Sequence, residues 1–265
     1  MLRARLATAA VAIPLLLVLI LYPSPWPLAV LVFIVGIIGL DEFSRMPFAH
    51  QKGEWALTVI LGTIVLLGAL SMHEHMLGLS IALALILGLL WVLFTRPDFE
   101  QGLRDLGLSI LGALYVGALL PHFVWLQQSG ELGPRWVVFI IAVAMVGDTA
   151  GYFVGHALGR HKLTPRVSPG KTVEGTIGVV LGSLVAGVLC KLIFLSTLTI
   201  QETLLLSGAM GVLGQLGDLC ESVMKRAFAT KDSGWIFPGH GGVLDRIDSL
   251  LFPVIFVYYH LALFR

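Results

Sequence analysis

The sequence predicts an all-α polytopic membrane protein with about nine transmembrane helices. Its 265 residues are 57% apolar and only 12% charged, and their mean hydropathy is +0.92. Soluble domains carry about 25% charged residues, so this composition indicates a chain that lies largely in lipid. Successive apolar runs near the length of a membrane-crossing helix are the second observation. The uneven distribution of Lys and Arg between these runs is the third.

The apolar runs predict the spans in chain order. The first run follows Arg3 and Arg5, and we interpret it as an uncleaved span because no small-residue cleavage site follows it. The second run is short, so a re-entrant segment is its alternative. No soluble domain fits between the runs. The predicted spans are 6–22, 26–40, 55–72, 76–94, 106–127, 135–158, 173–198, 203–225 and 248–264.

Basic side chains fall almost entirely in one alternate set of loops. The other set holds only Arg135 and Arg265, and Lys191 lies within a span. Because cytoplasmic loops are enriched in Lys and Arg, this bias predicts a cytoplasmic N-terminus, an external C-terminus, and loops 159–172 and 226–247 on the cytoplasmic face. The basic residues of the rich set are Arg3, Arg5, Arg45, Lys52, Arg96, Arg104, Arg160, Lys162, Arg166, Lys171, Lys225, Arg226, Lys231 and Arg246.

The chain is expected to divide at residue 134. Residues 1–134 would form scaffold helices, and residues 135–265 would form the bundle that carries the site and the two basic loops. Rows of small residues, such as Gly178, Gly182 and Ala186, allow helix backbones in this bundle to approach closely. Packing within the chain is the simpler interpretation of these rows, and a homodimer is the alternative.

Asp148 lies in the middle of the sixth predicted span. An ionisable side chain at this depth is costly unless it is paired or hydrated, so Asp148 is a candidate functional residue. It shares a helical face with Tyr152 and Gly155. The alternative is a structural carboxylate that is hydrogen-bonded between helices.

Two further spans carry acidic residues at their predicted cytoplasmic ends. Asp218, Glu221 and Lys225 share one face of the eighth span. Asp245 and Asp248 are one turn apart as the ninth span begins. Carboxylate oxygens suit Mg²⁺, which usually binds substrate phosphates together with one or two carboxylates. The alternative for Lys225 is a helix-end side chain that snorkels to the membrane surface. This alternative explains Asp218 poorly, because Asp218 faces an apolar turn.

Two glycine-containing loops are candidates for phosphate binding. In the segment 238–242, the N–H groups of Gly241 and Gly242 can approach a phosphate, and His240 can act as a base or a donor. The segment 168–172, Ser-Pro-Gly-Lys-Thr, leads into a predicted helix whose N-terminus favours anions. The alternative for the second loop is a contact with anionic lipid headgroups. It is not a Walker A loop, because the first glycine is missing.

The 27 residues from Ser222 to Asp248 resemble the signature of the phosphatidate cytidylyltransferase family, also called CDP-diacylglycerol synthases. They read S-V-M-K-R-A-F-A-T-K-D-S-G-W-I-F-P-G-H-G-G-V-L-D-R-I-D, and every fixed position of the signature is met. The resemblance extends over residues 145–250. His156 stands where the family usually has Arg or Lys, and Val173 stands where it often has Trp.

The resemblance implies an enzyme of phospholipid biosynthesis in the bacterial inner membrane. It would condense CTP with phosphatidic acid, with Mg²⁺ as cofactor and the active site facing the cytoplasm. Asp218 and Asp245 would be metal ligands, and Asp148, Glu221 and Asp248 would support them or bind metal. The residues expected to bind substrate phosphates or act in catalysis are Ser168, Lys171, Thr172, Lys225, Arg226, Lys231, His240, Gly241, Gly242 and Arg246.

Two other functions compete with this interpretation. A CDP-alcohol phosphatidyltransferase is disfavoured because the run of carboxylates typical of that family is absent. An ion-coupled transporter would use Asp148, Lys191 and Asp218 as a relay, but it leaves the two cationic glycine loops unexplained. Membrane lipids are expected neighbours of the chain, and a net charge of +1 gives no indication of nucleic acid binding.

Overall fold

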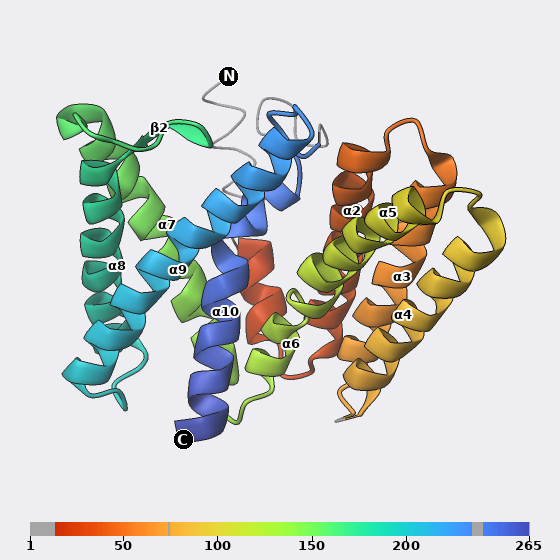
Figure 1. Cartoon of the computed structure of the whole chain (residues 1–265). Helices are drawn as coiled ribbons and strands as arrows, with labels where there is room; N and C mark the ends of the chain where they lie inside the picture. The colour runs from red at the N-terminus through yellow and green to blue at the C-terminus, as the bar shows by residue number, and fades with distance from the viewer. Residues whose placement is uncertain (1–13, 74, 235–240, 265) are drawn as a thin grey trace.

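The computed structural model describes residues 14–73, 75–234 and 241–264, and these residues form an almost entirely helical bundle (Figure 1). The predicted all-α polytopic class is therefore confirmed. In chain order the elements are α2 (Trp26–Phe48), α3 (Lys52–Leu70), α4 (Met76–Thr95), α5 (Phe99–Gly112), η1 (Ala113–Ala118), α6 (His122–Gln127), α7 (Gly133–Leu158), β1 (Lys162–Thr164), β2 (Ser168–Thr172), α8 (Val173–Ile193), α9 (Ile200–Ala227) and α10 (Leu244–Phe264).

Eight segments of the described residues are long and apolar enough to cross a membrane. They match the second to ninth predicted spans, with ends that are shifted by up to eight residues. The fourth of the eight, Phe99–Gln127, combines α5, the π-helix η1 and the short α6. Of the first predicted span, residues 14–21 are helical and residues 6–13 lie outside the described residues.

Helix α2 is longer than the apolar run that predicted it. The run ends at Leu40, but the helix continues through a polar stretch to Phe48 and reaches 23 residues. Glu42 and Ser44 in this stretch are buried against the rest of the bundle, with 2% and 0% of their surfaces exposed. The whole helix is therefore long and apolar enough to cross a membrane, which favours a span over the re-entrant alternative.

The larger of two hydrophobic cores joins the two halves of the chain. It combines buried side chains of α2 and α6, such as Phe43 and Leu126, with those of α7 and α10, such as Phe139 and Val254. The smaller core lies between α3, α4 and α5 and includes Leu61. The expected division at residue 134 stays a prediction, and the larger core crosses it.

The small-residue rows of the late helices are used for packing within the chain. A Cβ atom added to Gly182 of α8 would lie 2.5 Å from Cβ of Ala150 in α7. A Cβ atom added to Gly211 of α9 would lie 2.8 Å from the Ser183 hydroxyl in α8. Such distances are too short for real side chains, so the glycines permit the close α7–α8 and α8–α9 approach. The simpler interpretation of these rows is confirmed.

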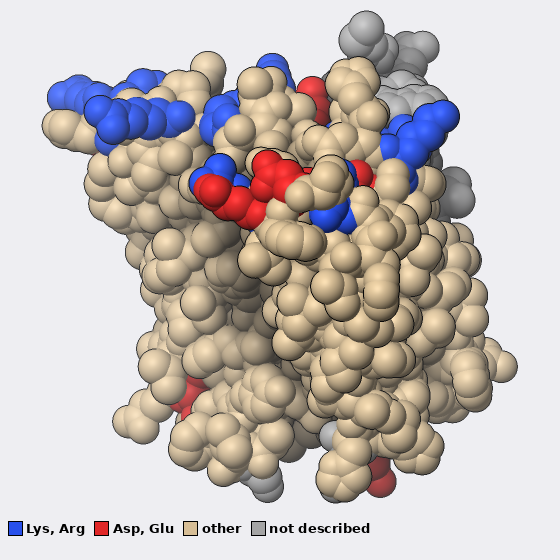
Figure 2. Space-filling model, turned by 45° about the vertical axis from the view of Figure 1, so that its right-hand side comes forward, with Lys and Arg blue, Asp and Glu red and all other residues tan. Residues whose placement is uncertain are grey.

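One end of the bundle collects the basic side chains (Figure 2). The connections α2–α3, α4–α5, α7–α8 and α9–α10 all lie at this end, and the C-terminal end of α10 lies at the other (Figure 1). We call it the basic end. The described Lys and Arg residues of the predicted cytoplasmic loops belong to these four connections or to the helix turns beside them.

The loop 159–172 contains a small antiparallel hairpin that the sequence did not predict. Strand β1 pairs with β2, so that Lys162 lies opposite Thr172 and Thr164 opposite Ser168. The hairpin lies over the basic ends of α7, α8 and α9 (Figure 1). Its short strands have no apolar alternation, which is why the sequence pattern gave no signal.

Candidate active site

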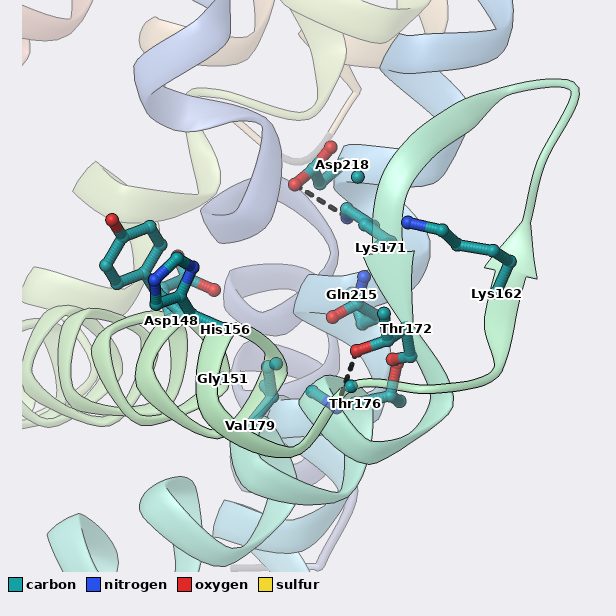
Figure 3. Close-up of a pocket in the computed structure, with 15 residues that line it drawn as sticks. Asp148, Gly151, His156, Lys162, Lys171, Thr172, Thr176, Val179, Gln215 and Asp218 are labelled. Atoms are coloured by element: carbon teal, nitrogen blue, oxygen red, sulfur yellow. Dashed lines mark hydrogen bonds and ion pairs between the residues drawn. The ribbon is translucent and has the colours of Figure 1, made fainter.

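A cavity of about 600 Å³ opens between α7, α8, α9 and the hairpin (Figure 3). It lies at the basic end, where the late helices come together. Its walls are polar on the hairpin side and contain glycines on the helix side. The lining residues are Asp148, Gly151, Tyr152, Gly155, His156, Gly159, Lys162, Gly170, Lys171, Thr172, Gly175, Thr176, Val179, Gln215 and Asp218.

Helix α7 presents one polar face to this cavity. Asp148, Tyr152 and His156 follow one another at intervals of one turn on that face. The Asp148 carboxylate accepts a hydrogen bond of 3.2 Å from the hydroxyl of Ser249 in α10. The His156 ring stacks on Tyr152, with ring centroids 6.1 Å apart. The predicted shared face of Asp148 and Tyr152 is confirmed, and it faces the cavity.

Lys171 and Asp218 form an ion pair inside the cavity. The Lys171 ammonium on β2 lies 2.7 Å from the Asp218 carboxylate on α9 (Figure 3). The other oxygen of Asp218 accepts a hydrogen bond of 3.3 Å from the Ser222 hydroxyl. Thr172 ends the hairpin and caps α8, because its hydroxyl accepts the Gly175 N–H at 3.1 Å. The predicted phosphate residues Lys171 and Thr172 therefore both line the cavity.

Glu174 fixes the base of the hairpin. Its carboxylate accepts hydrogen bonds from the backbone N–H groups of Arg160 and His161 and lies 2.6 Å from the His161 ring. At the far side of the loop, the Arg226 guanidinium donates to the Val167 carbonyl at 3.1 Å. The sequence analysis assigned no role to Glu174. The available signal was an acidic residue in the first turn of a helix that follows a threonine cap, where a negative charge is favourable.

A second charged cluster lies between α9 and the start of α10. The Lys225 ammonium lies 2.9 Å from the Glu221 carboxylate and 2.5 Å from the Asp245 carboxylate. The Lys225 and Asp245 side chains are each only 10% exposed, and Glu221 is fully buried. A lysine this well enclosed is not a snorkelling side chain, because its ammonium points into the protein.

Asp245 has a full set of donors in the described structure. Its Oδ1 atom binds Lys225, and its Oδ2 atom accepts from the Ser233 N–H, the Ser233 hydroxyl and the Gly242 N–H at 2.8–3.0 Å. Asp218 binds a different lysine, Lys171. The structure therefore holds the two predicted metal ligands in separate ion pairs, and their role toward a metal stays a prediction.

Glu221 and Asp248 place two carboxyl groups side by side. Asp248 is 8% exposed, and its carboxyl group lies next to that of Glu221. The Glu221 Oε1 atom is buried and receives no hydrogen bond within the described part of the chain. Adjacent buried carboxylates repel strongly, so this pair suits a proton or a cation. Among the described residues, no three acidic, His or Cys side chains converge on one point.

The two described glycines of the His-Gly-Gly segment make room for carboxylates. Gly241 has φ of +80°, and a Cβ atom there would lie 2.6 Å from the Asp245 carboxylate. A Cβ atom on Gly242 would lie 2.5 Å from the carboxylate of Glu42 in α2. The predicted contact of these glycines with phosphate is not tested, and the Gly242 N–H is bonded to Asp245. His240 lies outside the described residues.

The remaining predicted residues lie near the Lys171–Asp218 pair and the Lys225 cluster. Ser168 begins β2 opposite Thr164. Arg226, Lys231 and Arg246 are exposed at the basic end. Glu42 was missed by the sequence analysis, although an acidic residue at the end of an otherwise apolar helix is a recognisable signal.

The fold and the site define an integral membrane protein with a charged cavity at one end of its helical bundle. A sequence model of the Cytidylyltransferase family matches residues 3–264. The chain therefore belongs to the cytidylyltransferase family.

Several curated relatives share one name. The chain is 35% identical over 246 residues to the phosphatidate cytidylyltransferase of Bacillus subtilis (strain 168), with 90% of each chain covered. It is 32% identical over 230 residues to the phosphatidate cytidylyltransferase of Staphylococcus epidermidis, with 85% of this chain and 86% of the relative covered. The protein of this name from Staphylococcus saprophyticus is 31% identical over 229 residues.

These comparisons confirm the predicted enzyme class, a CTP-dependent nucleotidyltransferase. They give no support to the ion-coupled transporter. The structure also differs from the relay that a transporter would need, because Asp218 is paired with Lys171 rather than with Lys191.

Proposed function

We propose that this chain condenses CTP with phosphatidic acid to form CDP-diacylglycerol and pyrophosphate. The observation that carries the proposal is the similarity over 90% of the chain to a phosphatidate cytidylyltransferase. The charged cavity agrees with it, because a nucleotide triphosphate and a phospholipid both bring phosphates to the membrane surface. The cavity combines lysines for these phosphates with carboxylates that can hold a cation.

The proposed reaction forms one phosphorus–oxygen bond and breaks another. A phosphate oxygen of phosphatidic acid attacks the α-phosphorus of CTP, and the bond from that phosphorus to the bridging oxygen of the β-phosphate breaks. The bonding electrons leave with pyrophosphate. The attacking oxygen is already anionic, so the reaction needs no strong base. The barrier comes from bringing anions together, and fixed cations lower it.

The cations of the site are assigned to this task. Lys171 enters the cavity from the hairpin, and Lys225 lies in the cluster below it. Lys171 is held by Asp218, and Lys225 is held by Glu221 and Asp245, so each ammonium has a fixed position. We assign the phosphates of CTP and lipid to Lys171, Lys225, Arg226, Lys231 and Arg246, with further hydrogen bonds from Ser168, Thr172, His240, Gly241 and Gly242.

The carboxylates of the site fit a role in holding Mg²⁺. The buried Glu221 Oε1 atom accepts no hydrogen bond among the described residues, and the neighbouring Asp248 carboxyl group, whose Oδ1 accepts the Ser249 N–H at 2.7 Å, supplies a further oxygen ligand. Two carboxylates are enough when substrate phosphates complete the coordination. When bound, Mg²⁺ would neutralise phosphate charge and assist departure of pyrophosphate. The carboxylates proposed to take part in metal binding are Asp218, Asp245, Asp148, Glu221 and Asp248, and they do not all converge on one point in the described structure.

The basic end is proposed to face the cytoplasm, in the inner membrane of a bacterium. The basic connections at this end support the orientation through the positive-inside bias. CTP is a cytosolic nucleotide, so the same orientation brings it to the cavity. A homodimer remains a proposal. The glycine rows no longer support it, because they pack helices within the chain.

The proposed reaction is tested with CTP labelled in two positions. Purified protein in detergent is given phosphatidic acid and Mg²⁺ with label in the α- or the γ-phosphate. We expect α-label in extracted lipid and γ-label in pyrophosphate, and both must depend on phosphatidic acid. Transfer of γ-label to lipid, or labelling without phosphatidic acid, contradicts the proposal. Omission of Mg²⁺ with added chelator tests the cofactor separately.

A further inference from the structure

Glu42 is a buried carboxylate that lies next to the cluster of Lys225 and Asp245, although it is far from these residues in the sequence. It lies in α2, in the half of the chain expected to be scaffold, and only 2% of its surface is exposed. Most buried carboxylates in proteins have an ion partner or several hydrogen bonds, because desolvation of the charge is costly. The partners of Glu42 therefore indicate what it does.

The partners are the first backbone groups of α10. The Glu42 Oε1 atom accepts the Val243 N–H at 2.9 Å, and Oε2 accepts the Leu244 N–H at 2.9 Å. These N–H groups have no intrahelical acceptor at a helix start, and the helix dipole favours a negative charge there. Glu42 thus caps α10 from another helix, about 200 positions away in the chain.

The cap reaches the charged cluster through Ser233. The Ser233 hydroxyl lies 3.2 Å from Glu42 Oε2 and 2.9 Å from Asp245 Oδ2, so it stands between the two carboxylates and can donate its proton to either. Gly234 and Gly242 leave the space that the Glu42 side chain fills. The two ends of the loop between α9 and α10 are therefore held against one side chain of α2.

We propose that Glu42 is a positioning residue for the Lys225–Asp245 pair, a role that rests on the proposed function. It fixes the first turn of α10, and this turn carries Asp245 toward Lys225 at 2.5 Å. Loss of the cap lets the turn shift, so the cations and carboxylates of the cluster no longer converge on the reacting phosphates. Small displacements of this kind reduce turnover strongly, because the reaction depends on alignment.

The proposal is tested with Glu42→Gln in the full-length protein. Glutamine keeps the shape but turns an amide NH₂ toward a backbone N–H, which leaves that donor unpaired. We expect kcat for CDP-diacylglycerol formation to fall by about 10-fold or more, with KM for CTP within about threefold, as one lost charge-assisted bond predicts. Rates are expressed per folded molecule, measured from the amplitude of the thermal unfolding transition.

The matched control is Glu54→Gln. Glu54 is also a buried carboxylate of the scaffold half, 6% exposed, but it pairs with Arg96, and its helix α3 packs mainly on α2, α4, α5 and η1. This variant should lose stability and keep kcat per folded molecule within about twofold. Hydrogen exchange of a peptide covering 241–250 gives a readout without activity, and only Glu42→Gln should accelerate it.

Each outcome decides the proposal. If Glu42→Gln loses stability like Glu54→Gln and keeps the wild-type kcat, Glu42 is merely structural and the proposal is overturned. If Glu42→Gln does not fold, Ser233→Ala removes only the hydroxyl between the two carboxylates and should lower kcat by roughly threefold; an unchanged kcat there overturns it as well. If the wild-type protein makes no CDP-diacylglycerol, the proposed function fails, and the exchange experiment still reports whether Glu42 anchors the turn.

Discussion

Lys171 on the hairpin and Asp218 on α9 form an ion pair of 2.7 Å across the candidate active site. The pair joins a loop to a membrane helix, and its side chains remain 20% and 36% exposed. A partly exposed ion pair adds little to stability, since water screens it. Its position in the cavity therefore points to a role in substrate binding.

Lys171→Ala is expected to impair catalysis and leave the fold intact. Loss of one charge-assisted phosphate contact corresponds to about 1.5–3 kcal/mol, or roughly 10- to 150-fold in kcat/KM for CTP. Steady-state kinetics and thermal unfolding measure the two effects. Lys52→Ala removes an exposed cation from the same end of the bundle outside the cavity, and it serves as the control. Equal kinetics of both variants would remove Lys171 from the site.

Asp218→Asn and Asp245→Asn are each expected to lose nearly all turnover, but they should differ in folding stability. Asp245 is 10% exposed and pairs with a buried lysine, so its variant should also lose roughly 3 kcal/mol of folding free energy. Asp218 is more exposed, and its variant should unfold near the wild-type temperature. Activity across a Mg²⁺ titration, with thermal unfolding, separates the two. Near-native rates of both variants at low Mg²⁺ would place the metal site elsewhere.

Gly242→Ala is expected to destabilise the protein and slow the reaction. The added Cβ would lie 2.3 Å from the Ser233 hydroxyl, 2.5 Å from the Glu42 carboxylate and 2.6 Å from the Gly234 nitrogen, so either the loop or α2 must move. Overpacking of this kind costs about 1–3 kcal/mol. Gly107→Ala is the control, because no atom lies within 4 Å of its added Cβ. Thermal unfolding and kcat are measured for both, and a Gly242→Ala protein as stable as Gly107→Ala would contradict the close packing of Ser233, Glu42 and Gly234 around this position.

The proposed orientation predicts which introduced thiols are protected in intact cells. The two native cysteines, the buried Cys190 and the exposed Cys220, are first replaced so that only the introduced thiols can react. Arg166→Cys lies in the turn of the hairpin, and Glu131→Cys lies in the connection before α7 at the opposite end. An impermeant thiol reagent should label only Glu131→Cys from outside and label both in opened vesicles. Labelling of Arg166→Cys in intact cells would reverse the orientation.

The sequence by itself determined the class of fold and the region of the site. Apolar runs near the length of a membrane-crossing helix predict spans directly, because the bilayer imposes its thickness on each helix. Acidic residues within such runs are costly, so Asp148 and Asp218 stand out without any structure. Their neighbours in the helix, such as Tyr152 and Glu221, follow from the helical period.

Only the tertiary structure decided which charges meet. Lys171 could have faced any carboxylate of the late helices, and the hairpin that directs it to Asp218 has no apolar pattern to reveal it. Glu42 caps a helix about 200 positions away, and its carboxylate, together with the Ser233 hydroxyl and the Gly234 nitrogen, leaves no room for a side chain at Gly242. Helical periodicity relates residues within one element, whereas contacts between elements depend on how the whole bundle packs.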